Sequence, residues 1–248
     1  MLHDPQLTNE ADSQGFTELA MFGERCSGLT YVEQRMTETF PGLSVTHEYG
    51  WSHGFVNPPY IRPSSFCVVV VRNVLDWVQH LHRTPFQAAE WSQDASISQF
   101  LRNEWSCTTN GRVLGKPYHK LGLARNTEFM SERHPMTGQR IRNVIELRTL
   151  KMMSLLKLQH LTPNCAYLRY EDMVAAGDDM MDMLQARLNM PKRADLAEVE
   201  LDLALQGHPP RDLDAPLAEL SEEDLRFIGA ELDHETEAAF GYSYDLPR

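Results

Sequence analysis

Residues 19 to 31 read Leu19-Ala20-Met21-Phe22-Gly23-Glu24-Arg25-Cys26-Ser27-Gly28-Leu29-Thr30-Tyr31. The apolar start predicts the end of a strand, the glycines predict a turn, and the following residues have a helical pattern. Such a loop can bind a phosphate-like anion, because loop N–H groups and the helix N-terminus provide donors and a partial positive charge. The segment therefore predicts an anion site, while a plain strand–helix turn is the alternative interpretation.

The glycine spacing matches a Walker loop, but the Walker lysine is missing. Gly23 and Gly28 fit the pattern Gly-x-x-x-x-Gly-Lys-Ser/Thr, and Leu29 stands at the lysine position. Because that lysine holds the terminal phosphates of a nucleotide, an ordinary ATP or GTP hydrolase is disfavoured. Ser27 and Thr30 could add hydroxyl donors to the loop.

Length and charge predict one α/β domain, residues 1–248, with room for a local basic site. The 248 residues can bury a sizeable core, and no linker rich in Ser, Gly and Pro divides them. The net charge of −12 argues against general nucleic-acid or membrane binding. Residues 161–248 carry a net charge of −13 and residues 1–160 a net charge of +1, so an anion site fits the first part better.

The cysteines and the N-terminal residues indicate a cytoplasmic protein. Cys26, Cys67, Cys107 and Cys165 show no CxxC spacing. Residues 1–16 are polar and acidic, which argues against a signal peptide, and the longest apolar run, residues 66–71, is too short to span a bilayer. Neither HExxH nor paired Cys/His spacing occurs, so no metal is expected.

The rest of the chain alternates strands and helices. The continuous β-branched run of residues 66–71 is typical of a central parallel strand that is covered on both faces. This alternation predicts a three-layer α/β fold with a central, mainly parallel sheet flanked by helices. After the loop, the apolar stripe of Val32, Met36 and Phe40 predicts a helix that Pro41-Gly42 ends. Further strands are predicted at 43–49 and 165–170, and further helices from 75, at 97–105, 138–160, 180–188 and from a capping box at 221–224 to about 240.

Two segments have weaker patterns. Residues 85–137 predict an ordered insertion or lid, and the basic residues of 112–142 within and beside it are equally consistent with a solvated surface loop. Residues 189–216 are rich in Pro and Asp and predict an irregular surface segment.

Several polar residues follow the predicted strands. Ligands of α/β sheets bind beyond the carboxyl ends of the strands, where the glycine loop, His53 and Arg72 would all lie. Arg72 could pair with a phosphate through a charge-assisted contact. An ion pair between Arg72 and Asp76 is the structural alternative.

Four segments together resemble the bacterial-type sulfotransferases, a P-loop-like family that uses 3′-phosphoadenylyl sulfate as donor. Gly23-Glu24-Arg25-Cys26-Ser27-Gly28-Leu29-Thr30-Tyr31 is similar to the family's 5′-phosphosulfate loop, and Val70-Val71-Arg72-Asn73-Val74-Leu75-Asp76 to its 3′-phosphate motif. Leu168-Arg169-Tyr170-Glu171-Asp172-Met173 looks like its Arg-Tyr-Glu-Asp-Leu segment, and residues 220–242 look like its C-terminal helix. The order and spacing fit over residues 18–84 and 138–242.

The resemblance implies a nucleotide-binding enzyme that transfers a sulfuryl group in line to a hydroxyl or amine of a small-molecule acceptor, without a metal. His53 would be the general base, with His47 and His80 as rival candidates, and Arg25 would assist at the bridging oxygen. A histidine that only hydrogen-bonds the adjoining loop is the structural alternative for His53. Aromatic residues such as Trp51, Phe55 and Trp105 would contribute to the acceptor pocket, together with 85–137. The residues implied in donor binding are Gly23, Arg25, Cys26, Ser27, Gly28, Leu29 and Thr30 at the 5′ end, and Arg72 and His80 at the 3′-phosphate.

Three positions depart from the family pattern. Cys26 replaces the cation of the loop, Leu29 its second Thr, and His80 the Ser of the 3′-phosphate motif. These departures leave a second hypothesis open, a catalytically weak or inactive relative that binds a nucleotide or a partner. A small-molecule kinase on the same framework is a third hypothesis, against which the missing lysine argues.

Overall fold

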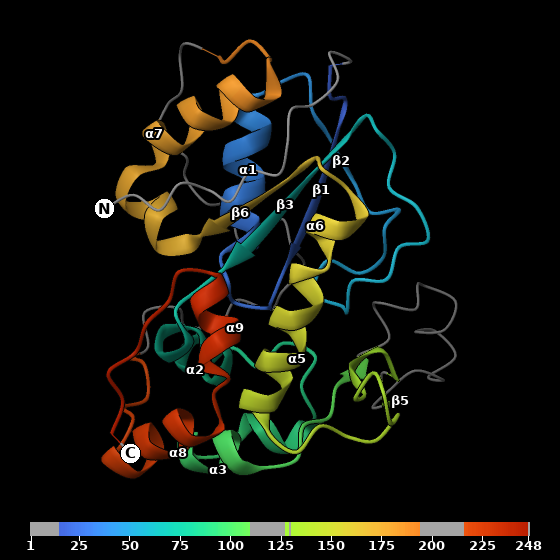
Figure 1. The fold of residues 1–248 in the computed structure, drawn as a ribbon. Coiled ribbons are helices and arrows are strands. Elements are labelled where there is room, and N and C mark those ends of the chain that lie inside the picture. Colours follow the sequence, from blue (N-terminus) through green and yellow to red (C-terminus); the bar gives the residue numbers. More distant parts are fainter. Residues whose placement is uncertain (1–14, 110–126, 129, 194–215, 248) are drawn as a thin grey trace. The chain divides into compact units, whose positions relative to one another are not determined.

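The structure, a computed structural model, describes residues 15–109, 127–128, 130–193 and 216–247 (Figure 1). The chain divides into two compact units, Met1–Val74 with Met153–Ala215 and Leu75–Met152 with Pro216–Arg248. The basic residues predicted between 110 and 126 and most of the irregular segment 189–216 lie outside the described residues.

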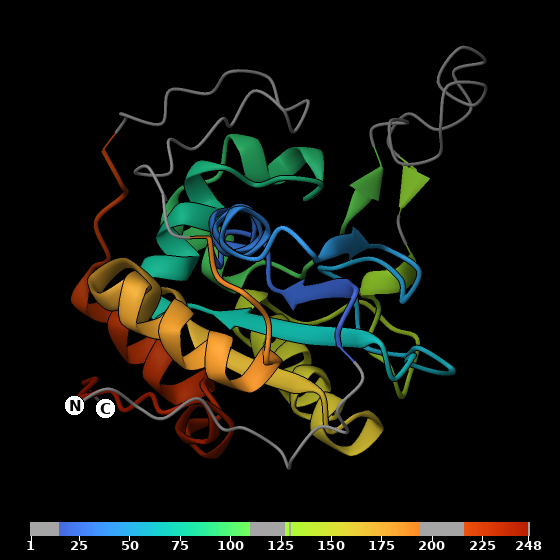
Figure 2. The same ribbon diagram turned by 90° about the horizontal axis from the view of Figure 1, so that it is seen from above.

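The first unit contains a four-stranded parallel sheet. Its strands are β1 (Glu18–Gly23), β2 (Ser44–Thr46), β3 (Ser65–Val71) and β6 (Cys165–Arg169), in the order β2-β1-β3-β6. Figure 2 shows β1 and β3 side by side, and every residue of β3 is buried. A strand buried on both faces needs apolar residues at every position, which explains the continuous run. The predicted α/β fold with a central parallel sheet is thus confirmed.

Helices cover both faces of this sheet. α1 (Leu29–Thr39) and α7 (Tyr170–Leu188) share one apolar core with alternate strand residues such as Met21, Val68 and Leu168 (Figure 1). Tyr167 alternates to the other face, where its hydroxyl accepts a hydrogen bond from the Gln159 N–H of α6 (Leu158–Leu161) at 3.1 Å. The sheet therefore forms the middle of three layers.

Helix caps account for most differences between predicted and observed boundaries. The helix predicted at 138–160 is two helices, α5 (Val144–Leu156) and α6, and α5 begins late because the Asn143 side chain accepts hydrogen bonds from its first turn. The last predicted helix is also two, α8 (Glu222–Glu231) and α9 (His234–Ala239), since Asp233 caps a new helix. α7 begins at Tyr170 rather than 180 and has a non-helical Ala176, and β2 is shorter than the predicted strand.

The second unit is mainly helical. Its central contact is the buried guanidinium of Arg148 on α5, which pairs with both carboxylate oxygens of Glu237 on α9 at 2.6 and 2.9 Å and lies over the Trp77 ring. This buried pair anchors the C-terminal segment to α5. Its other elements are most of α2 (Val74–Arg83), η1 (Glu90–Gln93), α3 (Ile97–Arg102), β4 (Thr108–Thr109), β5 (Thr127–Glu128) and η2 (Met130–Glu132). Nowhere in the described ranges does a helix combine the length and apolarity needed to cross a membrane.

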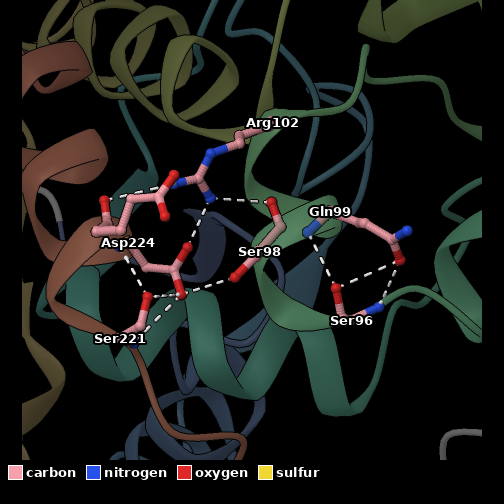
Figure 3. A network of polar contacts seen from close by, with 7 residues as sticks. Ser96, Ser98, Gln99, Arg102, Ser221 and Asp224 are labelled. Atoms are coloured by element: carbon pink, nitrogen blue, oxygen red, sulfur yellow. Dashed lines mark hydrogen bonds and ion pairs between the residues drawn. The ribbon is translucent and has the colours of Figure 1, made fainter.

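A polar network joins α3 to the N-terminus of α8 (Figure 3). Buried Asp224 closes the predicted capping box with Ser221, and its carboxylate accepts hydrogen bonds from Ser98 at 2.8 Å and Arg102 at 2.5 Å. Burial alone would raise the pKa of Asp224, but the bonds from Arg102, Ser221 and Ser98 outweigh it and lower this pKa from 3.8 to about 2.

We predict that Asp224 contributes stability that is lost in acid. Because its folded pKa lies below its unfolded value, the contribution is complete above pH 4 and disappears as the pH falls through 2; it amounts to about 2 kcal/mol. Urea unfolding between pH 5 and 2 should show a smaller loss of unfolding free energy for Asp224→Asn than for wild type. Exposed Glu222 in the same turn offers the control Glu222→Gln, which should follow wild type. Parallel curves for wild type and Asp224→Asn would contradict the prediction.

Candidate anion-binding site

The strand order places two predicted segments at one edge of the sheet in the first unit. From β1 the chain passes through α1 to β2 on one side, and β3 then pairs with the other side of β1. In open parallel sheets, ligands bind where the strand order reverses in this way, beyond the carboxyl ends of the strands. The loop of residues 23–28 follows β1 and Arg72 follows β3, so both lie at this point.

The two loop glycines are needed for different reasons. A Cβ atom at Gly23 would lie 2.5 Å from the Val70 carbonyl oxygen of β3, so the loop starts where no side chain fits. Gly28 has φ 87°, and a Cβ there would also lie 2.1 Å from the Tyr170 ring. The Walker-like spacing thus follows from contacts with β3 and with the start of α7.

The loop backbone between them can form an anion nest. φ is positive at Cys26 (62°) and Gly28 (87°) and not at Ser27 between them. Alternation of this kind can turn successive N–H groups toward one side, where they can receive an anion. The Ser27 N–H already donates to the Glu24 carbonyl at 3.2 Å, so the nest would use the N–H groups that follow it. Gly28 is also the N-cap residue of α1, and within the described chain no side chain caps this helix. The N-terminus of α1 therefore adds donors and a partial positive charge to the loop.

Ser27 provides an independent indication of a ligand. Its side chain is 0% exposed, and among the described residues its Oγ has no hydrogen-bond partner. The Oγ lies beside the start of the loop, 2.9 Å from the position that a Cβ at Gly23 would take. A buried hydroxyl without a partner costs about 1–3 kcal/mol, which an anion in the loop would offset by accepting its hydrogen bond.

Two arginines contribute charge at the loop. Arg72 Nη1 donates to the Cys26 carbonyl at 3.3 Å, and its guanidinium lies 4.6 Å from the centre of the Tyr170 ring. Arg25 is buried and lies 5.5 Å from the centre of the Trp51 ring. Buried Glu24 adds one carboxylate to the same loop. The structure thus brings Arg72 to the glycine loop, as predicted.

His53 is tied to the first loop residue. Its Nδ1 lies 2.9 Å from the Gly23 carbonyl oxygen, and the Gly23 N–H donates to the Ser52 carbonyl at 3.0 Å. Because a carbonyl only accepts, Nδ1 must carry a proton, and the neutral imidazole then has an unprotonated Nε2. The Trp51 ring contacts His53 as well as Arg25, at 5.8 Å between ring centres. Such a histidine is oriented to accept a proton at Nε2.

Other predicted residues have different positions. His47 is exposed in a turn that the Gly50 N–H closes, and His80 belongs to the second unit, where its Nδ1 donates to the Asp76 carbonyl of α2. The Leu29 side chain is part of the core, so only its backbone could meet a ligand; Thr30 is partly exposed in the first turn of α1. Trp105 is a fully buried core residue of the second unit that donates to Glu132, instead of an acceptor-pocket aromatic.

Tyr170 and Glu171 lie at the site but were not among the predicted site residues. Tyr170 contacts Gly28 and Arg72, and the Glu171 carboxylate accepts a hydrogen bond from the Asn73 N–H at 2.7 Å. Their position directly after β6, at the same sheet edge as the loop, is the signal that could have found them. Among the described residues no cluster of three candidate ligands could hold a metal ion.

Comparison with models of protein families finds none that matches this chain, and comparison with curated proteins finds no similar sequence. The resemblance to sulfotransferases therefore stays a prediction. The loop, its buried hydroxyl and the neighbouring Arg72 and His53 define the candidate site by geometry alone.

We predict that an anion in this loop protects Cys26 from alkylation. Cys26 is half-buried and the other three cysteines are buried; burial, aided by Cys165, raises the pKa of Cys67 to about 12. Iodoacetamide, which is neutral, should modify Cys26 first, and sodium sulfate should slow this reaction relative to sodium chloride of equal ionic strength. Cys26→Ser should abolish the fast phase. Equal rates in the two salts would contradict an anion site at the loop.

Proposed function

We propose that this chain is a sulfotransferase that moves a sulfuryl group from 3′-phosphoadenylyl sulfate to a hydroxyl or amine of a small acceptor. The anion cradle at the carboxyl ends of β1 and β3 carries the proposal, because the same sheet edge also holds a cation and an oriented histidine. The four-motif resemblance supports it independently.

In this proposal the loop holds the 5′ end of the donor. The backbone N–H groups at Gly28 and Thr30 and the Ser27 hydroxyl would bind the phosphosulfate, and Arg72 would pair with the 3′-phosphate. Two anionic groups on one ligand need two cationic or amide-rich cradles. Tight positioning matters here, since in-line transfer requires the acceptor oxygen or nitrogen to face the sulfur.

His53 would act as the general base. Its Nε2 would take the acceptor proton as the new bond to sulfur forms and the bond from sulfur to the bridging oxygen breaks. Adenosine 3′,5′-bisphosphate then leaves with the electron pair of that bond. Loop N–H groups, the Ser27 hydroxyl and the Arg25 guanidinium are the groups proposed to stabilise the charge on the bridging oxygen.

One observation favours a second candidate, a binding protein with little or no activity. Cys26 occupies the position of the family cation, and Arg25 beside it is buried at the Trp51 ring. If Arg25 stays at this ring, the bridging oxygen lacks a side-chain cation and transfer is slow. The nucleotide cradle is the same in both candidates.

We predict that adenosine 3′,5′-bisphosphate binds without magnesium. Arg72→Ala should weaken this binding by roughly 10- to 100-fold, because hydrogen bonds to charged groups contribute about 1.5–3 kcal/mol. Calorimetry in the presence of a chelator measures the affinity of the wild type and of the variant. Arg62→Ala is the matched control, since Arg62 precedes β3 at the opposite sheet edge and pairs with Glu48. Magnesium-dependent binding of ATP, with no binding of the bisphosphate, would instead support a kinase.

A second prediction separates the enzyme from the binding protein. His53→Asn keeps a donor for the Gly23 carbonyl but removes the base, so kcat should fall by roughly 10²- to 10⁴-fold while bisphosphate affinity changes little. Release of bisphosphate from the donor with a panel of phenols, alcohols and amines provides the assay. Bisphosphate binding without any sulfated product would favour the binding protein.

A further inference from the structure

The Tyr170 ring contacts both the anion loop and Arg72. A Cβ at Gly28 would meet its Cδ2 at 2.1 Å, and the Arg72 guanidinium lies 4.6 Å from the ring centre. The Tyr31 ring meets it edge-on, with ring centres 6.0 Å apart. These three contacts indicate that the ring packs against the neighbouring side chains and the loop.

A second contact ties the same two segments together. The Glu171 carboxylate accepts a hydrogen bond from the Asn73 N–H at 2.7 Å, next to the contact of Arg72 with Tyr170. Arg169 and Asp172 pair at 2.7 Å across the start of α7 and hold this turn in place. Residues 72–73 and 170–171 therefore form a double contact, here termed the clasp, between the end of β3 and the start of α7.

The clasp restricts where Arg72 can go. An arginine side chain has several rotatable bonds and loses much conformational entropy when it binds an anion. The Tyr170 ring and the Cys26 carbonyl both contact the guanidinium and hold it at the loop. An anionic group that binds beside Cys26, which is the 3′-phosphate in the proposed function, would then meet an arginine that is already oriented.

We propose that Tyr170 is a positioning residue that holds Arg72 at the anion loop. This inference rests on the anion-binding part of the proposed function and is independent of sulfuryl transfer. If Tyr170 had a purely structural role, its substitution would change the stability of the fold. The coupling between Tyr170 and Arg72 in sulfate affinity would then be zero.

The test is a double-mutant cycle that combines substitutions of Tyr170 and Arg72 and measures sulfate affinity. The affinity is measured as the sulfate concentration that halves the alkylation rate of Cys26. Tyr170→Leu should raise this concentration by roughly 3- to 30-fold in wild type and by less than about 2-fold in Arg72→Ala. Tyr170→Phe keeps the ring and should stay close to wild type in both backgrounds. Melting temperatures of all variants establish that they are folded.

If Tyr170→Leu does not fold, 3,5-difluorophenylalanine at position 170 replaces it. Fluorine weakens the attraction of the ring face for a cation with little change in shape, so sulfate affinity should fall relative to Tyr170→Phe only while Arg72 is present. Equal effects of the Tyr170 variants with and without Arg72 would overturn the positioning role and leave the proposed function intact. If sulfate does not protect Cys26 in wild type, both proposals are overturned.

Discussion

The candidate site depends on the backbone of Gly23. No side chain fits between its Cα and the Val70 carbonyl, and its peptide groups are hydrogen-bonded to Ser52 and His53. This one residue therefore joins β1, β3 and the loop that follows β2. Because close packing transmits small displacements, the geometry of the histidine and of the nest is set by the same contact. The anion loop and the proposed base are thus parts of one rigid arrangement within the first unit.

Both arginines of the site contact aromatic rings. Arg72 rests on a carbonyl and a tyrosine ring, and Arg25 lies at a tryptophan ring. Carbonyls and aromatic faces attract a cation while leaving its formal charge in place. In the second unit, by contrast, Arg148 pairs with both oxygens of Glu237, and that charge serves the fold. Arg148 stabilises the second unit, whereas Arg72 contacts the loop that is proposed to bind an anion.

Local sequence patterns predicted most of the helices and strands. The features that they did not predict depend mainly on contacts between residues far apart in the chain. The β-branched run of β3, the helix stripe of α1 and the capping box of Ser221 each depend on neighbours in sequence, and each prediction is confirmed. The start of α7 was missed because α7 follows β6 without an intervening loop, so Tyr170 was assigned to the strand. Asp172, which pairs with Arg169, favours a helix start at this position. The His53 tautomer and the contact of Arg72 with Tyr170 join segments far apart in the chain, which no local pattern reports.

The residue at the Walker lysine position gives the loop its particular chemistry. Leu29 begins α1 with its side chain in the core, so a lysine there would have to bury an ammonium group at a cost of several kcal/mol or leave the packed position. The helix therefore contributes backbone donors alone, and the cations come from outside it, from Arg25 earlier in the loop and Arg72 after β3. A Walker lysine binds the phosphates of a magnesium-bound nucleotide, and this loop has no lysine at that position. The cradle suits a ligand with separate anionic groups, which is why a phosphosulfate donor is proposed in preference to a triphosphate.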